Sequence, residues 1–361
     1  MMSWSELPAD LVTAIAGRLT ELADLSRFRS VCPSWRSASA EHAARRRVPL
    51  LLLPNGDHRT RFNHGVWSLT DDRLMEIPPL ATRDRPYLFA SNHGWMLAVK
   101  PNLSLTLVHP FVGDSANLPM LPPGFHADVE DHLYDMAWDW SPNGVVVCLP
   151  DMGAFFSRPG DRLWRPIAGC SSSSSVTYCD DAFFLFGDDK KVTVVDAESL
   201  AVAAVIEPPA KRTFPRWPYN INLIVSPDEF LLVTTPLSRS GPNGGRVKVF
   251  RAGRAAGDRR TSWSEVDGIG GRAVFVDNLR AFCVEANAHN GLRRNCVYVV
   301  ARSHEEVHDD YGTLNVKGRY TVAIHDIAGD LTAVDLSLEK EVSVRSNRLW
   351  QWPSWLWPSP R

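Results

Sequence analysis

Residues 4–36 read WSELPADLVTAIAGRLTELADLSRFRSVCPSWR, and this stretch contains the first pattern that decides the fold. Its apolar side chains recur at the spacing of one face of an α-helix. Pro8 suits a first helical turn because its missing N–H has no helical partner there, and Asp10 is favoured near the positive end of the helix dipole. The pattern predicts a first helix over residues 8–19.

Two more short helices are predicted in the same region. Asp24 is placed to cap the second helix, and Pro33 ends that helix and opens the third. The arginine run Arg45–Arg47 lies at the negative end of the third helix, where cations are favoured. The sequence therefore predicts a small all-α module of three helices over residues 3–47.

A module of this size cannot bury much apolar surface and is marginal unless it docks on something else. Its helices carry more apolar side chains than they can hide among themselves. Exposed apolar patches mark sites where partners bind. We expect one such patch, formed by Leu7, Leu11, Ile15, Leu25, Val31, Cys32 and Trp35.

From residue 48 onward the sequence is typical of β-strands, with short apolar runs separated by turns such as Asn143-Gly144. New clusters of runs begin near residues 48, 86, 134, 175, 221 and 271, at intervals of roughly 38 to 50 residues, which is the length of a four-stranded propeller blade. We expect an all-β, propeller-like domain of about six blades over residues 48–361. The runs are Pro49–Leu53, Trp95–Val99, Val145–Leu149, Ala182–Phe186, Phe230–Thr234, Ala273–Val276 and Val297–Ala301.

The helical module resembles the plant F-box. The resemblance rests on Trp4–Leu11, Ile15, Arg18-Leu19, Asp24-Leu25, Arg27–Arg29, Val31-Cys32 and Trp35-Arg36. It implies docking onto the Skp-family adaptor of a cullin-RING ubiquitin ligase. The residues that it implies as adaptor contacts are Leu7, Pro8, Leu11, Ile15, Leu25, Val31, Cys32 and Trp35. The alternative is a small helical cap on the domain that follows.

The rest of the chain resembles the plant domain of unknown function 295, which follows many F-boxes and is regarded as a kelch-like or KIB-type β-propeller. The resemblance rests on residues 87–96, 105–111, 270–276 and 355–359. His109 stands where that family usually has Asn before Pro, and Trp357 stands where it usually has Thr. The resemblance implies a propeller that presents loops to a client protein.

Composition and charge exclude several classes of protein. The 39 Lys and Arg residues nearly balance the 41 Asp and Glu residues, so a net charge of -2 gives no electrostatic case for a nucleic-acid or membrane partner. No run of 18 apolar residues is present, and the first residues do not resemble a secretory signal. The six cysteines form no C-x-x-C pair, so we expect reduced thiols. The expected location is cytoplasmic, nuclear or both, and not secreted.

One motif suggests an enzyme. The run from His304 through Glu305 to His308 satisfies the H-E-x-x-H pattern, in which two imidazoles one helical turn apart bind zinc and the glutamate polarises a water. A strand-like run precedes the motif and no amphipathic helix surrounds it. We therefore expect a polar loop between strands, with no metal ligand, cofactor or catalytic residue in the chain.

Four other features have structural interpretations with open alternatives. The acidic His cluster at 126–132 is expected to be a solvated loop or, alternatively, a cation site. Ser171–Ser175 is expected to be a flexible connection between blades, which could accept phosphate. The basic residues from Arg251 to Arg260 indicate an exposed hairpin loop or a contact for an acidic partner. The tryptophans from Trp350 to Trp357 are expected to pack the closing segment onto the blades, or else to stack on a sugar or peptide.

These predictions combine into one expected function. The chain is expected to be the substrate-recognition subunit of a Skp-cullin-F-box ubiquitin ligase, with the adaptor and cullin on one side and an unknown client on the other. An F-box protein that acts as a scaffold, or that titrates the adaptor without ubiquitination, is the first alternative. A zinc hydrolase built on His304, Glu305 and His308 is the remote alternative.

Overall fold

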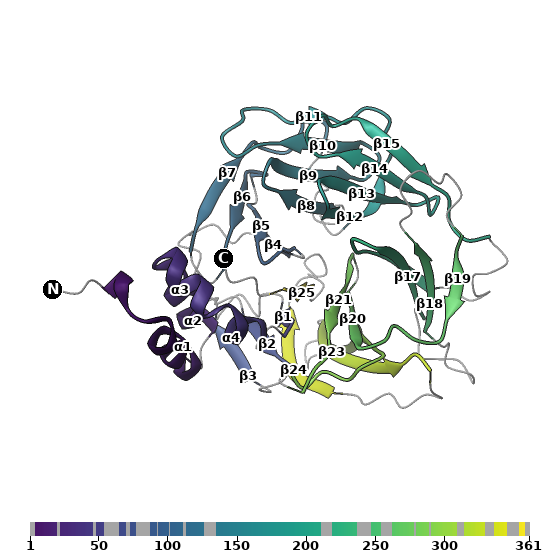
Figure 1. Cartoon of the computed structure of the whole chain (residues 1–361). Coiled ribbons are helices and arrows are strands. Elements are labelled where there is room, and N and C mark those ends of the chain that lie inside the picture. The colour runs from purple at the N-terminus through teal and green to yellow at the C-terminus, as the bar shows by residue number, and fades with distance from the viewer. Residues whose placement is uncertain are drawn as a thin grey trace.

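The computed structural model of the chain describes a helical lobe followed by a ring of β-sheets (Figure 1). The described residues are 4–19, 22–45, 48–53, 65–69, 73–76, 87–91, 93–100, 102–110, 113–125, 135–210, 219–236, 247–253, 262–277, 279–288, 290–308, 314–328, 336–344 and 354–357.

The helical lobe has a 3₁₀ turn and four short helices where three helices were predicted. They are η1 (Trp4–Glu6), α1 (Ala9–Arg18), α2 (Leu22–Ser30), α3 (Pro33–Ala38) and α4 (Ala40–Arg45). The predicted first helix corresponds to α1. The predicted third helix is divided into α3 and α4.

The break between α3 and α4 lies at Ser39, whose side chain competes for the helical carbonyls. The Ser39 hydroxyl donates to the Trp35 carbonyl at 2.7 Å, and the buried Arg29 guanidinium donates to the Arg36 carbonyl at 3.0 Å. Serine favours such local bonds over a continuous helix. The prediction of one long third helix was therefore wrong.

Six sheets, each of four or five strands, are arranged as blades around a common axis (Figure 1). The prediction of six blades is confirmed. From the innermost strand outward, blade 1 is β25 (Ser354–Leu356), β1 (Leu50–Leu52), β2 (Gly65–Ser68) and β3 (Arg73–Glu76); blade 2 is β4 (Tyr87–Ala90), β5 (Met96–Val99), β6 (Leu105–Val108) and β7 (Ser115–Leu118); blade 3 is β8 (Ala137–Ser141), β9 (Gly144–Leu149), β10 (Gly153–Ser157) and β11 (Arg165–Pro166).

The other three blades complete the ring. Blade 4 is β12 (Ser173–Cys179), β13 (Ala182–Gly187), β14 (Val192–Asp196) and β15 (Val202–Ile206); blade 5 is β16 (Tyr219–Val225), β17 (Glu229–Pro236), β18 (Lys248–Gly253) and β19 (Ser264–Val266); blade 6 is β21 (Ala281–Glu285), β20 (Arg272–Val276), β22 (Cys296–His308), β23 (Leu314–Asp326) and β24 (Leu336–Val344). Each of the seven predicted apolar runs coincides with one of these strands.

Strand β9 illustrates why the central strands read as unbroken apolar runs. Successive side chains in a strand point to opposite faces, and in a propeller both faces of a blade pack against neighbouring blades. Val145 and Val147 accordingly join a core with blade 2, whereas Val146 and Cys148 join a core with blade 4. Gly144 begins the strand at φ +153°, where an added Cβ would lie 2.6 Å from a backbone oxygen, so this turn requires glycine.

Blade 6 departs from a simple up-and-down order. Strand β20 lies between β21 and β22 and pairs in parallel with β22. The connection between β21 and β22 is held by two asparagines. The Asn290 amide donates to the Glu285 carbonyl at 2.7 Å, and the Asn295 side chain accepts from the Ile269 N–H at 2.9 Å.

The ring is closed by the last described strand. Strand β25 pairs antiparallel with β1, so blade 1 is made from both ends of the propeller sequence. The Trp355 side chain is fully buried, packs edge-on against Phe275 with ring centroids 4.9 Å apart, and donates from its indole N–H to the Val276 carbonyl. The predicted packing of this closing segment onto the blades is confirmed for Trp355 and Trp357.

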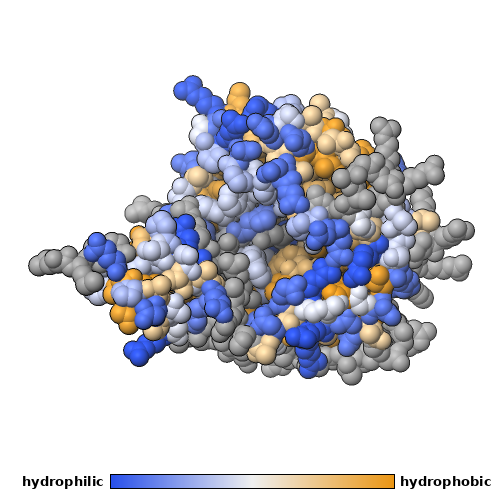
Figure 2. Space-filling view, in the orientation of Figure 1, coloured by the Kyte–Doolittle hydropathy of each residue, from blue (hydrophilic) through white to orange (hydrophobic). Residues whose placement is uncertain are grey.

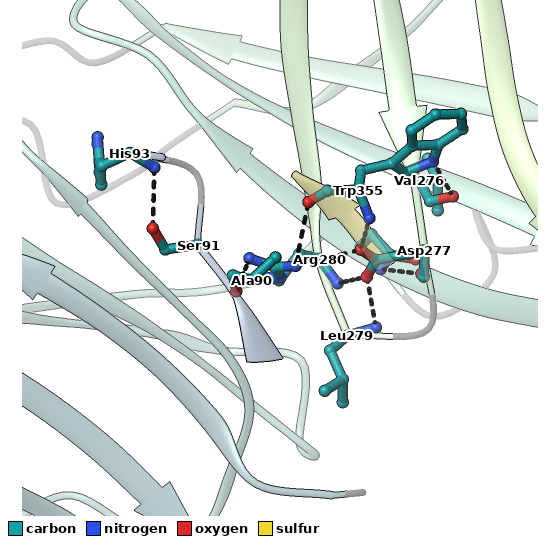
Figure 3. A network of polar contacts seen from close by, with 9 residues as sticks. Ala90, Ser91, His93, Val276, Asp277, Leu279, Arg280 and Trp355 are labelled. Atoms are coloured by element: carbon teal, nitrogen blue, oxygen red, sulfur yellow. Dashed lines mark hydrogen bonds and ion pairs between the residues drawn. The ribbon is translucent and has the colours of Figure 1, made fainter. Parts of the chain in front are cut away.

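A buried polar network supports the closure (Figure 3). The Asp277 carboxylate accepts the backbone N–H groups of Leu279, Arg280 and Trp355 at 2.8–3.0 Å. The Arg280 guanidinium pairs with Asp277 and donates to the carbonyls of Trp355 in blade 1 and Ala90 in blade 2. Three blades are therefore joined by one ion pair.

Replacing Trp355 by alanine should lower the free energy of unfolding by about 3–5 kcal/mol, because a large, fully buried side chain and a hydrogen bond are lost. Urea denaturation of the whole chain measures the change. Leu163→Ala, at a side chain that is 74% exposed, is the control and should shift stability by no more than about 0.5 kcal/mol. Equal midpoints for the two variants would contradict this account of closure.

Candidate functional site

Helix α1 has two apolar sides. Val12 and Ala16 point into the core of the helical lobe, where they are essentially inaccessible. Leu11 and Ile15 lie one position earlier and remain 49% and 38% exposed. A surface helix normally needs only the first of these sides to be apolar. The second side is therefore apolar surface beyond what the lobe needs for its own packing.

Two more large apolar side chains of the helical lobe are exposed. Val31, between α2 and α3, is 58% exposed, and Trp4 in η1 is 73% exposed. The buried Trp35 indole donates to the Trp4 carbonyl at 3.1 Å, which ties η1 to α3. We call Trp4, Leu11, Ile15 and Val31 the helical surface. Figure 2 shows apolar atoms on the side of the helical lobe that faces away from the ring.

The predicted contact residues divide into three groups by exposure. Pro8, Leu11, Ile15 and Val31 are exposed; Leu7 and Cys32 are half-buried; Leu25 and Trp35 are buried. The patch predicted from the sequence placed Leu25 and Trp35 on the surface, and this was wrong, because both side chains are used to fill the core of the lobe. Trp4 is exposed but was not among the predicted contact residues, since periodicity does not reveal exposure outside a helix.

The core of the helical lobe is separate from the cores of the blades. Phe28 and Trp35 lie at its centre with ring centroids 4.4 Å apart. Every member of this core lies between Leu7 and Ala43, and Val48 already packs with blade 1 and blade 6. The helical surface is thus carried by a unit that fills its own interior.

A second polar cluster, not foreseen from the sequence, lies where blades 2, 3 and 4 meet. The His93 Nε2 atom lies 3.5 Å from the Asp139 carboxylate and 3.2 Å from the Tyr178 carbonyl. Asp139 is almost fully buried and accepts the Tyr178 N–H at 2.8 Å. Burial lowers the pKa of His93, but Asp139 and the Tyr178 carbonyl raise it by more, so the pKa lies above its ordinary value.

Comparison with known proteins identifies the propeller. Residues 66–326 match the family described as the KIB1-4 beta-propeller. This chain belongs to that family. The F-box protein SKIP23 of Arabidopsis thaliana is 25% identical over 80% of this chain and 81% of its own length. Two more Arabidopsis proteins with F-box names, At4g22660 and the F-box/kelch-repeat protein At5g24040, are 21% and 24% identical over 93% and 82% of this chain and 95% and 86% of their own lengths.

The predicted resemblance to plant F-box proteins with a KIB-type propeller is confirmed by these matches. Among solved structures, the propeller domain of Cps50 (Swd1) from Myceliophteria thermophila is 10% identical, with a TM-score of 0.39 over 79% of this chain and 83% of its own. The count of six blades in this KIB1-4 family member comes from the strand pairing of the chain itself.

The zinc-binding motif does not lie on a helix in this KIB1-4 propeller. His304 and His308 lie within strand β22, paired opposite Gly318 and Leu314 of β23, so the predicted loop was wrong. Four strand positions span about 13 Å, whereas two zinc ligands must each approach within about 2 Å of the metal. Among the residues that the structure describes, no group of three or more His, Cys, Asp or Glu could hold a metal ion.

The remaining sequence features are partly corrected. Ser173 and Ser175 are buried in β12, so only the first two residues of the Ser171–Ser175 run lie outside a strand. Arg251 lies in β18 and forms an ion pair with Glu229 at 2.8 Å, instead of lying in a loop. The cluster at 126–132 lies outside the described residues, as do Arg254, Arg259, Arg260, Trp350 and Trp352. No described helix is long and apolar enough to span a membrane.

The stability of the KIB1-4 propeller should depend on the charge of His93. Because its pKa is raised in the folded state, protonation stabilises the fold; this contribution is fully present below about pH 6.5 and is lost as the pH rises through the raised pKa. We expect the stability difference between the native chain and His93→Gln to be larger at about pH 5.5 than at about pH 8. Urea titrations at both pH values measure it.

Asp139→Asn serves as the matched variant, because it removes the charge that raises the His93 pKa. Because burial by itself lowers the His93 pKa, the variant should abolish or reverse the same pH dependence even if it lowers stability at both pH values. A His93→Gln difference that stays constant with pH would show that His93 does not titrate as described.

Proposed function

We propose that this chain is a receptor subunit of a Skp-cullin-F-box ubiquitin ligase. The helical lobe docks on a Skp-family adaptor and, through it, on a cullin, and the propeller holds a client protein. The observation that carries the proposal is the helical surface, which remains exposed on a lobe whose own core is complete. The F-box names of relatives that match nearly the whole chain support the same assignment.

The proposed domain boundary lies between residues 47 and 48. Ala43 is the last residue of the helical core and Val48 is the first residue of the propeller core. We assign residues 3–47 to the adaptor-binding module and residues 48–361 to the client-binding propeller. This division is supported by the absence of any shared core cluster between the two parts among the described residues.

The residues of the proposed interface have different roles. Pro8, Leu11, Ile15 and Val31 touch the adaptor, because their side chains are exposed and adjacent to the core of the lobe. Leu7 and Cys32 lie at its margin. Leu25 and Trp35 are positioning residues: they are buried and fix α2 and α3 in place. Apolar side chains on helices that fit a partner groove are a common mode of recognition.

The proposed mechanism uses proximity alone. Holding a client and a ubiquitin-charged enzyme in one assembly raises their effective concentration, so no acid, base or nucleophile of this chain is required. The protein must then be located where the adaptor is, in the cytoplasm or nucleus. A scaffold or adaptor-titrating role would use the same helical surface and is the alternative. Ubiquitination of a captured client in a reconstituted ligase would separate the two.

Truncation of the helical surface should abolish adaptor binding without unfolding the lobe. Leu11→Ala and Val31→Ala are each expected to cost about 2 kcal/mol of binding free energy, or roughly 30-fold in Kd. Calorimetric titration of the full chain with a purified Skp-family adaptor measures the loss. Thermal unfolding should be nearly unchanged, because both side chains are exposed.

Ser37→Ala is the matched control, since Ser37 is an exposed residue of α3 outside the helical surface. It should bind as tightly as the native chain. Tight binding by the Leu11→Ala, Val31→Ala double variant would overturn the site assignment. Failure of the native chain to bind any Skp-family adaptor would overturn the proposed function itself.

A further inference from the structure

The outer strand of blade 4 is unlike the other described outer strands. Strand β15 has the sequence Val-Ala-Ala-Val-Ile, and Val202 and Val205 are 39% and 50% exposed. The other outer strands contain charged or polar residues or are short: β3 is Arg-Leu-Met-Glu, β7 is Ser-Ala-Asn-Leu, β11 is Arg-Pro, β19 is Ser-Glu-Val, and β24 contains Glu-Lys-Glu. Proteins normally protect sheet edges with such residues, so an outer strand without them requires an explanation.

A β-bulge makes this edge more apolar on one face. Val205 pairs with Thr193 and Ala204 with Val194, but the register then shifts and Val202 pairs with Val195. Thr193 and Val195 lie two positions apart on β14 and therefore share a face of the sheet. The extra residue, Ala203, thus brings Val202 and Val205 to the same face. Figure 1 places β15 on the outer rim of the ring, and Figure 2 shows apolar atoms there.

The end of the blade at which β15 begins is acidic. The Ala197 N–H donates to the Asp181 carbonyl at 2.9 Å, which joins the turn before β13 to the turn before β15. These turns contain four carboxylates, Asp180, Asp181, Asp196 and Glu198, and no Lys or Arg occurs from 176 to 189 or from 193 to 206. Hydrogen bonds from Ser199 lower the pKa of Asp196, so this carboxylate is charged at neutral pH. The other end is mixed, with Lys191 paired to Glu207 at 3.1 Å.

We propose that β15 is a client-binding edge that takes an extended, apolar protein segment with a Lys or Arg next to the acidic turns. The unpaired N–H and C=O groups of an edge strand match only another extended strand, and the two valines give such a segment an apolar face to cover. The four carboxylates favour a cationic residue at one end of it. This inference rests on the proposed receptor function, because it supplies the surface that a client would use.

A second copy of this chain is a poorer occupant. An antiparallel pair of β15 strands would place the acidic end of each copy beside the mixed end of the other, where Lys191 is already neutralised by Glu207. Lys190 lies at the same end, but Asp188 and Asp189 precede it, so the acidic turns of one copy would meet no excess of positive charge on the other.

The test uses two labelled peptides and the full chain without adaptor. The first peptide is Val-Thr-Val-Thr-Val-Arg-Arg, and the second ends in Glu-Glu instead of Arg-Arg. Fluorescence anisotropy should show saturable binding of the first peptide and binding of the second that is at least about tenfold weaker. Val205→Lys, which adds a charge to the apolar face, should weaken the first peptide by at least about tenfold.

Matched variants separate the two parts of the proposal. Ser264→Lys adds the same charge to an exposed position of β19 and should leave peptide binding unchanged. The Asp181→Asn, Glu198→Gln double variant should abolish the preference for the arginine peptide while retaining the apolar contact. All variants should keep the unfolding midpoint of the native chain.

Three results would overturn the proposal: no binding of the arginine peptide, equal binding by Val205→Lys, or a dimer of the native chain that Val205→Lys converts to a monomer. The last result would assign the edge to a second copy. Adaptor affinity is measured on the same samples. Peptide binding without adaptor binding would sustain this edge and reject the ligase role, whereas adaptor binding without peptide binding would reject only the edge.

Discussion

Closure of the ring is the constraint on which the rest of the structure depends. In an open ring the first and last blades would each lack a neighbour and expose an apolar face, yet here the closing strand β25 has only three residues. The burial of Trp355 and the Asp277–Arg280 pair compensate for this short strand. Asn222 of blade 5 donates to the Asp277 carbonyl, so the same network reaches four blades in all. A buried ion pair with most of its hydrogen bonds made suits this role, because it fixes one arrangement of its neighbours.

The spacing of apolar runs was sufficient to predict six blades because each blade repeats one physical requirement. A strand covered on both faces must be apolar at every position, as β9 is, and this signal survives without any similarity between repeats. Strand order carries no such signal. The parallel pairing of β20 with β22 depends on a connection fixed by Asn290, which bonds to Glu285 at the start of the connection, and by Asn295, which bonds to Ile269, 26 residues earlier. The polar second half of β22 was predicted as a loop for a related reason. Its own residues do not favour a strand, and pairing with β23 maintains the strand there.

The helical lobe shows the same limit at the level of a single site. Periodicity located α1 and its apolar residues. Adjacent positions such as Leu11 and Val12 differ by 100° around the helix, however, and in the structure Leu11 is exposed whereas Val12 is buried. Which side faces the core is decided by α2 and α3, through Leu25 and Trp35. A resemblance to a family cannot separate residues that touch a partner from buried residues that hold those contact residues in place. Burial shows which of these side chains are exposed, and it places Leu25 and Trp35 in the interior.

The connection between the two cores bears on how a proximity mechanism could work. Ala43 and Val48 belong to different cores and are five residues apart, so even a fully extended chain would separate them by no more than about 18 Å. Effective concentration falls as the linker between two binding modules lengthens, and a short connection keeps it high. A rigid ring then sets the direction in which any bound segment is presented. Closure of the propeller and the short connection to the helical lobe therefore act together: the first fixes where a client surface lies on the ring, and the second fixes how far the ring lies from the helical surface.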